Sequence, residues 1–229
     1  MMNLENLVTT PIELFQQIHG LEREHLLQRA SQREYGRGDF IALAGERWPY
    51  LCLVEEGQIN LVKTSTEGRM LGAAKISVGE LFISPTIIDD WGLPASLSLS
   101  TPTSVYLWHR DDVLRGIKNN PEAMWAMCAW FVRRMRQASG YIEEMAFQPV
   151  ASRLARLILE GSQGVDRPLM RRDMTLNEIA TMIGTTGVMV CKLLHRFSEE
   201  GILEVTRADL NITDERALRE LAGVDSLGS

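Results

Sequence analysis

The chain has 229 residues, of which 45% are hydrophobic and 24% are charged, and its formal net charge is -6 at pH 7. This composition is typical of a globular protein with one large or two modest domains, and it lacks the overall basic charge of many nucleic-acid-binding proteins. The three cysteines are far apart and include no Cys-x-x-Cys pair, which argues against a zinc knuckle or a four-cysteine iron–sulfur cluster.

The start of the chain does not have the pattern of a targeting segment. Residues 1–15 lack the basic start and the long apolar core of a secretory signal peptide. No apolar run approaches the roughly 20 residues that a transmembrane helix needs. An odd number of cysteines without such a signal indicates free thiols, so we expect a cytoplasmic protein that has no membrane partner.

Residues 11–30 predict a short amphipathic helix, because apolar side chains recur at near-helical spacing. These residues are Leu14, Phe15, Ile18, Leu21, Leu26 and Leu27. From Tyr35 to His109 the pattern changes to short apolar runs, separated by Gly, Pro and Asp about every 8–12 residues. This spacing predicts an antiparallel sandwich or roll, with a hairpin turn at Glu67 and Gly68.

A long helix is predicted after Asn120, which is a suitable N-cap and precedes Pro121 at the first helical position. Apolar residues then follow at alternating spacings of four and three, the heptad pattern of a coiled-coil contact. This seam consists of Met124, Cys128, Phe131, Met135, Ala138, Ile142 and Met145. We expect the seam to pair two copies of the chain. The alternative is packing on the chain's own β domain, although Trp125, Met127 and Trp130 supply a second apolar face for that contact.

Pro149 ends the long helix, and a further amphipathic helix follows from Val150 to Gly161 or Gly164. Residues 175–199 then have the pattern of a helix-turn-helix. Its first helix has an apolar face of Leu176, Ile179, Ala180 and Ile183.

The ends of these two helices carry specific capping residues. Thr175 and Glu178 form a capping box, and Gly184 stands where the chain must turn sharply. Thr185 or Thr186 caps the second helix, whose buried face is Val190, Leu193, Leu194 and Phe197. Residues 201–213 predict a short hairpin, or wing, and a last helix begins after Asp214. A purely structural helical hairpin is the less favoured alternative.

The whole chain resembles the cyclic-AMP receptor / fumarate-nitrate regulator (CRP/FNR) superfamily of bacterial transcription factors, through residues 35–46, 53–82 and 175–203. Glycines fall where that family turns, at Gly38, Gly45, Gly57, Gly68, Gly79 and Gly184. The resemblance implies an α+β fold with an N-terminal antiparallel, jelly-roll-like β-roll, a long dimerisation helix and a C-terminal winged helix-turn-helix. The implied domains are 1–118 for the sensor, 119–148 for the dimerisation helix and 149–229 for DNA binding.

The loop after residues 79–80 departs from the cyclic-nucleotide-binding members of this family. In those members a Glu contacts the ribose, and an Arg followed by Ser or Thr grips the cyclic phosphate. The corresponding residues here are Ser84, Pro94 and Ala95. Proline has neither charge nor N–H donor and cannot replace a bidentate arginine. We therefore expect either an effector other than cyclic AMP, of apolar or aromatic character, or a pocket filled by its own side chains.

The residues expected to line this effector pocket are Gly79, Glu80, Ser84, Trp91, Pro94 and Ala95. An iron–sulfur cluster of the fumarate-nitrate type is disfavoured by the number and positions of the cysteines. Haem is a weaker option, with candidate axial ligands at His19, His25, His109 and Cys52. A metal-dependent enzyme needs clustered His and carboxylate ligands, and the β region contains only His109, so we do not expect an enzyme.

The resemblance places the first residues of the second helix in the major groove, where an Arg–Glu pair reads bases. The matching residues here are Gly187 and Val188, which cannot make bidentate hydrogen bonds, although Val188 can touch a thymine methyl group. The expected DNA contacts are Thr185, Thr186, Gly187, Val188, Lys192, Arg196 and Arg207, with Arg171 and Arg172 as further phosphate contacts.

Residues 150–229 contain ten Lys and Arg against twelve Asp and Glu, so DNA binding requires the charges to be segregated on one face. The sequence predicts a homodimeric transcription regulator that binds double-stranded DNA at a pseudo-palindromic operator through DNA shape and methyl contacts. RNA polymerase is a partner if the protein is an activator. The alternative is a family member with weakened DNA recognition that acts as a ligand- or protein-binding module.

Overall fold

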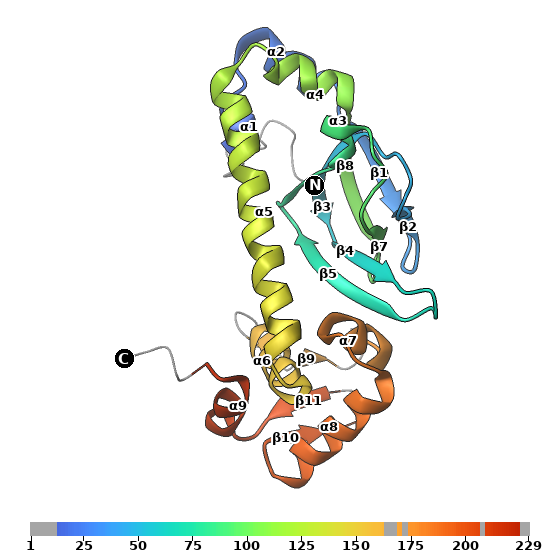
Figure 1. Cartoon of the computed structure of the whole chain (residues 1–229), viewed down its shortest axis with the longest axis vertical. Coiled ribbons are helices and arrows are strands. Elements are labelled where there is room, and N and C mark those ends of the chain that lie inside the picture. The colour runs from blue at the N-terminus through green and yellow to red at the C-terminus, as the bar shows by residue number, and fades with distance from the viewer. Residues whose placement is uncertain (1–12, 163–168, 171–173, 207–208, 225–229) are drawn as a thin grey trace. The chain divides into compact units, whose positions relative to one another are not determined.

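The computed structural model describes residues 13–162, 169–170, 174–206 and 209–224 (Figure 1). The chain forms two compact units, the first built from residues 1–64 and 73–139 and the second from residues 65–72 and 140–229. The two are described in turn.

The first unit contains a β-roll of two four-stranded antiparallel sheets. One sheet has the order β1-β8-β3-β6, with β1 at Ser31–Tyr35, β8 at Thr103–His109, β3 at Tyr50–Glu56 and β6 at Leu81–Ile83. The other has the order β2-β7-β4-β5, with β2 at Phe40–Ala42, β7 at Ser96–Ser98, β4 at Gln58–Thr64 and β5 at Met70–Ser77. The predicted antiparallel roll is therefore confirmed, including the turn at Gly68, whose φ is +79°.

The central strand β8 is buried on both faces, which explains its continuous apolar sequence. Val105 and Leu107 point into the core of the roll, together with Cys52 and Val54 of β3. Tyr106 and Trp108 point to the opposite face and pack against the helices. One sheet thus serves two cores.

Helices cover the outer face of this sheet. They are α1 at Glu13–Gln16, α2 at Gly20–Arg29, α4 at Arg110–Ile117 and the first part of α5 at Pro121–Phe147, and α2 and α4 lie side by side (Figure 1). Leu14, Ile18 and Leu26 are buried as expected, but the prediction for Leu21 is wrong because its side chain is 78% exposed. The helix is interrupted after Gln16, and α2 begins at Gly20 with φ +61°, so the apolar spacing does not continue through Leu21.

Several elements of this unit were not recognised in the sequence. The strands β1, β2 and β6 were missed, and so were the helices α3 at Thr86–Asp89 and α4. Strand β1 has the sequence SQREY, whose central residues are exposed, so no apolar alternation marks it. The others are too short for a periodic pattern to emerge, apart from α4, which begins directly at the end of β8.

Helix α5 begins as predicted, since the Asn120 Oδ1 accepts a hydrogen bond from the Ala123 N–H at 3.0 Å. Its inward face is formed by Ala123, Ala126 and Met127, with Trp130 partly buried beside them. Trp125 does not belong to this face, contrary to expectation, because it is 77% exposed. Small alanines, rather than Trp125, allow the helix to approach the sheet.

The second unit contains α6 at Val150–Ser162, α7 at Leu176–Ile183, α8 at Gly187–Glu199 and α9 at Glu215–Ala222, together with residues 140–147 of α5. A three-stranded antiparallel sheet has the order β10-β11-β9, with β10 at Leu203–Val205, β11 at Asp209–Ile212 and β9 at Leu169–Met170. The predicted wing hairpin and last helix are confirmed, with Asp214 accepting from the Ala217 N–H at 2.9 Å. Strand β9 was not predicted.

Candidate DNA-binding surface and effector region

The turn between α7 and α8 has the geometry that the sequence predicted. The Thr175 hydroxyl accepts a hydrogen bond from the Glu178 N–H at 3.1 Å, and the Glu178 carboxylate accepts one from the Thr175 N–H, which completes the capping box. Gly184 adopts a left-handed conformation at φ +63°, and Thr186 caps α8 by accepting from the Met189 N–H at 3.3 Å. These caps fix where α8 begins.

The buried and exposed faces of α8 are cleanly separated. Val190, Leu193, Leu194 and Phe197 are buried as predicted, in a core that α6, α7, β10 and α9 complete. Val188, Lys192, His195 and Glu199 follow one another at spacings of four, three and four, so they form a single stripe opposite the buried face. Val188 is 69% exposed at the N-terminal end of this stripe.

The charges on α8 are segregated along its length. Its first turn carries no acidic residue, and its carboxylates lie at the other end, where Glu199 pairs with His195 at 3.3 Å and Glu200 with Arg196 at 3.6 Å. The N-terminal half of the stripe thus presents Lys192 beside the positive end of the helix dipole, an arrangement that favours phosphate groups.

Most of the predicted DNA-contacting residues lie at or near this surface. Thr186, Val188, Lys192 and Arg196 are exposed, and Thr185 and Gly187 are partly exposed. The Arg196 guanidinium also stacks over the Phe197 ring, 5.3 Å from the ring centroid. Arg171, Arg172 and Arg207 lie outside the described residues. His195 was missed by the sequence reading, although its spacing from Lys192 marks the same stripe.

Gly187 has a local structural role. A Cβ atom at this position would come within 2.6 Å of the Asn177 Oδ1 on α7. The absence of a side chain therefore lets Asn177 approach the first turn of α8. A larger residue at position 187 would have to displace the Asn177 side chain.

The loop that starts at Gly79 is held by α5. The Glu80 carboxylate accepts from the Ser77 N–H at 2.8 Å, and Arg134 of α5 lies 3.9 Å from that carboxylate. The same guanidinium donates to the Leu81 carbonyl at 3.4 Å and stacks over the Trp130 ring at 5.1 Å. Sequence reading did not single out Arg134, because one arginine on a charged helix has no distinctive pattern.

The remaining residues of the predicted effector pocket point in different directions. Ser84 and Ala95 are buried, and Ser84 shares a 2.8 Å hydrogen bond with Thr86, which donates to the Trp48 carbonyl at 2.7 Å. Trp91 and Pro94 are exposed. The Ser84 hydroxyl is thus engaged within the protein rather than directed toward solvent.

The segment after Trp91 is held close to an earlier turn of the roll. The Gly45 N–H donates to the Leu93 carbonyl at 2.8 Å, and the Leu93 N–H donates to the Glu46 carbonyl at 2.9 Å. A Cβ at Gly92 would lie 2.2 Å from the Gly45 carbonyl oxygen, so only glycine fits there.

The candidate haem ligands already have local contacts. His25 pairs with Asp112 at 2.8 Å, and the His109 Nδ1 accepts from the Asp111 N–H at 3.3 Å. Cys52 is buried in the roll, and this burial raises the pKa of its thiol well above the ordinary value. Within the described parts of the chain, no cluster of three His, Cys, Asp or Glu side chains has the arrangement of a metal site.

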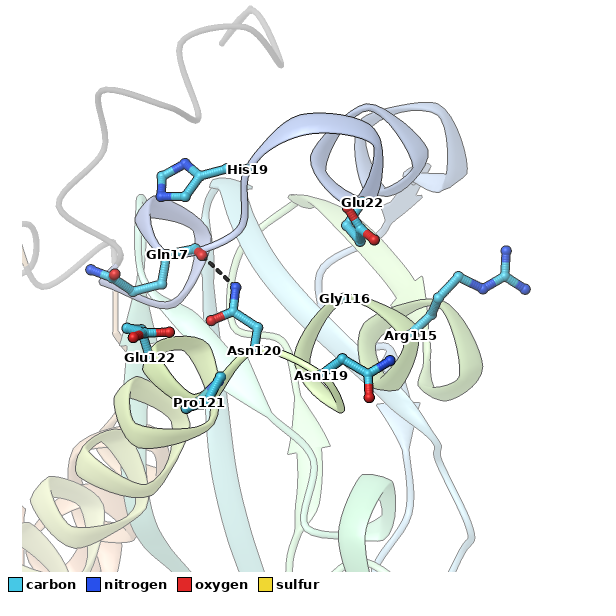
Figure 2. A pocket seen from close by; sticks show the side chains of 9 residues that line it. All are labelled: Gln17, His19, Glu22, Arg115, Gly116, Asn119, Asn120, Pro121 and Glu122. Atoms are coloured by element: carbon cyan, nitrogen blue, oxygen red, sulfur yellow. Dashed lines mark hydrogen bonds between the residues drawn. The ribbon is translucent and has the colours of Figure 1, made fainter.

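A surface pocket of about 400 Å³ lies among α1, α2, α4 and α5 (Figure 2). Its lining includes Gln17, His19, Glu22, Asn119 and Glu122, and Figure 2 shows Asn120 reaching across to the Gln17 carbonyl, a hydrogen bond of 2.7 Å. None of the residues predicted for the effector pocket lines it. Asn120 both caps α5 and connects it to Gln17, the residue directly after α1.

One buried carboxylate stands apart from these sites. Glu55 of β3 is 6% exposed and accepts hydrogen bonds from Gln32 at 2.5 Å, Ser104 at 2.8 Å and Tyr106 at 3.2 Å. Burial and the neighbouring Glu55 raise the pKa of Tyr106. The sequence did not indicate this network, because its members lie on separate strands.

No helix in the described parts of the chain is long and apolar enough to cross a membrane. A winged helix-turn-helix is the fold of many DNA-binding domains of transcription regulators, and here it follows a β-roll and a long helix with an exposed apolar stripe.

Comparison with known proteins agrees with this class. A Crp-like helix-turn-helix domain matches residues 152–221. The chain is 27% identical over 207 residues to the "Cyclic AMP receptor protein" of Thermus thermophilus, covering 89% of this chain and 95% of the relative. It is 22% identical to the "CRP-like cAMP-activated global transcriptional regulator" of Mycobacterium tuberculosis, covering 91% and 96% of the two chains.

Solved structures share the fold at lower identity. A transcriptional regulator of the CRP/FNR family from Eubacterium rectale superposes with a TM-score of 0.80 at 18% identity, covering 92% of this chain and 97% of that one. The c-di-GMP-responsive regulator CLP of Xanthomonas campestris superposes with a TM-score of 0.72 at 16% identity, covering 84% and 98%. The chain therefore has a Crp-like helix-turn-helix domain and is similar over most of its length to regulators of the CRP/FNR family. Its relatives are regulators rather than enzymes, as the sequence reading expected.

Proposed function

We propose that the chain is a homodimeric regulator that pairs through the seam on α5 and binds a pseudo-palindromic operator through α8 and the wing. The observation that carries this proposal is the exposed apolar stripe on α5. Within the same proposal, residues 1–118, 119–148 and 149–229 act as sensor, dimerisation helix and DNA-binding domain. Because its target is chromosomal DNA, we place the protein in the cytoplasm, with RNA polymerase as partner if it activates transcription.

The stripe is exposed where a partner would cover it. Met135 and Ile142 are 66% and 68% exposed, far above the exposure expected for apolar residues packed in a core. Cys128 and Ala138 are also exposed, and Met124 is at the limit of exposure, whereas Phe131 and Met145 are partly buried. Trp125 and Val132 extend the apolar surface along one edge of the seam. A contiguous apolar surface of this length favours a protein partner, and its heptad spacing favours a second copy of α5.

The seam is tested by placing a charge in it. Met135→Glu brings two carboxylates together in a parallel pair of helices, so we expect at least a tenfold weaker dimer in sedimentation equilibrium. Arg136→Gln, at an exposed neighbouring position, is the matched control and should leave the dimer intact. Unchanged association of Met135→Glu, with helix content retained by circular dichroism, would exclude this seam.

The native thiols provide a second test. Cys128 lies on the seam, so copper-phenanthroline oxidation should join two copies through a disulfide if the helices are parallel. Cys128→Ser should abolish the cross-linked dimer on a non-reducing gel, whereas Cys191→Ser should not. Cross-linking through Cys191 alone would place the contact elsewhere.

The DNA-binding surface is supported by the capped N-terminus of α8, the exposed Val188 and Lys192, and the carboxylate-free first turn. These groups suit phosphate contacts and contact with a thymine methyl group better than bidentate base recognition. An unbiased selection of bound genomic fragments, followed by fluorescence anisotropy on the recovered sequences, tests this surface. Recovery of no fragment, with or without cell extract as a source of effector, would favour the alternative of a ligand- or protein-binding module.

For the sensor domain, we propose an effector other than cyclic AMP, or none. The buried Ser84 and Ala95 and the exposed Pro94 support this view, because they supply no charged group for a cyclic phosphate. Native mass spectrometry of the protein as isolated would detect a co-purified effector. An absorbance spectrum would detect haem.

A further inference from the structure

Two polar atoms in the second unit are buried without a hydrogen-bond partner among the described residues. One is the Nε of Arg153 on α6, a residue that is only 8% exposed, and the other is the Tyr141 hydroxyl on α5. Buried polar atoms are nearly always hydrogen-bonded, so two of them in one neighbourhood need an explanation.

One edge of the Arg153 guanidinium has no hydrogen-bond partner among the described residues, and its Nε is buried. Its Nη1 lies against the Met145 sulfur, and a Cβ atom at Gly184 would be 3.2 Å from the same nitrogen. The opposite edge consists of Nε and Nη2. This is an edge on which an arginine binds two oxygens of a carboxylate or phosphate side by side.

The described residues provide no carboxylate within ion-pair distance of Arg153. Glu144, one turn of α5 from Tyr141, pairs instead with Arg156 at 3.7 Å. Arg153 and Arg156 against Glu144 leave one positive charge in excess. A buried cation without a counter-charge is unfavourable, and an anion from outside the chain would remove that penalty.

Tyr141 adds a donor to this neighbourhood. Burial raises the pKa of Tyr141, while the Arg153 charge acts to lower it and the Glu144 charge to raise it. The hydroxyl therefore keeps its proton at neutral pH. Its O–H bond is available to an acceptor beside the guanidinium.

We infer that Arg153 and Tyr141 form a binding site for a small oxyanion, a carboxylate or a phosphate group. Two of its oxygens would accept from Nε and Nη2 of Arg153, and one would also accept from Tyr141. A water molecule could satisfy the hydroxyl but would not neutralise the guanidinium.

The site lies beside the turn that sets the position of α8. Gly184 is the C-cap of α7 in a left-handed conformation, and the Arg153 Nη1 is adjacent to it. An anion on the free edge would fix the guanidinium there and stabilise the turn. Any consequence for operator affinity rests on the proposed function, whereas anion binding itself does not.

Thermal unfolding of the full chain in increasing inorganic phosphate, with ionic strength held constant by chloride, tests the site. We expect a saturable rise of about 2–4 °C when phosphate reaches about five times its dissociation constant. Acetate forms a second arm, and a response to acetate but not to phosphate assigns the site to carboxylates. No DNA is present, so the result is independent of operator binding.

The control variants separate the site from general salt effects. Arg153→Met should lose the response, and in buffer with neither phosphate nor acetate it should unfold at the same or a higher temperature than the wild type, because it removes an unpaired buried charge. Arg156→Met should keep the response, and Tyr141→Phe should weaken it several-fold. Two results would overturn the inference: no response of the wild type to either anion, or an equal response of Arg153→Met.

Discussion

Lys192 lies near the centre of the exposed stripe on α8. The first turn of this helix, which precedes Lys192, contains no acidic residue. A lysine that neutralises a phosphate releases bound counterions, so its removal acts on the salt dependence as well as on the affinity. For Lys192→Ala we expect weaker operator binding and a slope of log K against log salt that is smaller by about two, one phosphate contact for each copy. Fluorescence anisotropy over a salt series measures both quantities.

Lys118→Ala is the control for this change, since Lys118 is exposed at the end of α4 in the other unit. It should leave the slope unchanged. If the affinity lost by Lys192→Ala depends on the identity of one operator base pair, and the salt slope is retained, Lys192 recognises a base instead of a phosphate.

Glu55 shows how a single buried side chain supports the β-roll. Its carboxylate accepts from Gln32, Ser104 and Tyr106, so Glu55→Ala removes three hydrogen bonds from a buried site. We expect a loss of about 2–4 kcal/mol in the free energy of unfolding, measured by urea denaturation. Glu56→Ala, at the exposed neighbouring position, should change stability by less than about 0.5 kcal/mol. Equal effects would mean that the network contributes nothing.

At the scale of elements, predictability followed the strength of the periodic pattern. Helix α8 was predictable because its apolar positions, its cap at Thr186 and the turn at Gly184 all agree. Strand β1 was not, because an edge strand buries too little of its surface to require alternation. Helix α4 was hidden because its sequence follows directly on the apolar run of β8.

The candidate sites were less predictable than the elements, for a different reason. The sequence indicated which face of α8 is exposed, but the contact between Gly187 and Asn177 joins two helices and has no local pattern. Arg134, Arg153 and Glu55 likewise gain their significance from partners at other positions in the chain. Trp125 was assigned to a second apolar face with Met127 and Trp130, whereas the small Ala123 and Ala126 form that face together with Met127.

Gly140 tests the heptad register of α5. It lies inside the helix, on the side opposite Ala138 and Ile142, and a Cβ atom there meets nothing within 4 Å. Gly140→Ala should therefore stabilise the helix by up to about 1 kcal/mol, raising Tm by roughly 2–4 °C without affecting association. Scanning calorimetry and sedimentation measure the two quantities.

Gly116→Ala is a matched control within α4, where a Cβ would lie 3.3 Å from Leu26 and 3.4 Å from Ile18. This buried position should gain no stability, because crowding offsets the better helix propensity. A weaker dimer for Gly140→Ala would show that the partner contacts this side of α5 and that the seam is elsewhere.

For the whole molecule, the two units have separate hydrophobic cores. The roll has an interior core and an outer core beneath the helices, and the second unit has one of its own. Each unit therefore buries enough apolar surface to hold its own fold. Because these cores share no buried residues, substitutions in the roll and in the second unit can be made independently.

Cyclic AMP should not change operator affinity by more than about twofold. A ligand shifts the balance between a DNA-binding and a non-binding conformation only if it binds one of them more tightly than the other. The physical reason is the loop itself, in which Ser84 is hydrogen-bonded to Thr86, Ala95 is buried and Pro94 offers no charge to a cyclic phosphate. The Thermus thermophilus cyclic AMP receptor protein, which covers nearly the same length, is a suitable positive control. Thermal unfolding with and without cyclic AMP adds a second readout. A saturable rise in Tm together with tighter operator binding would show that other groups, such as Arg134 beside Glu80, replace the missing arginine.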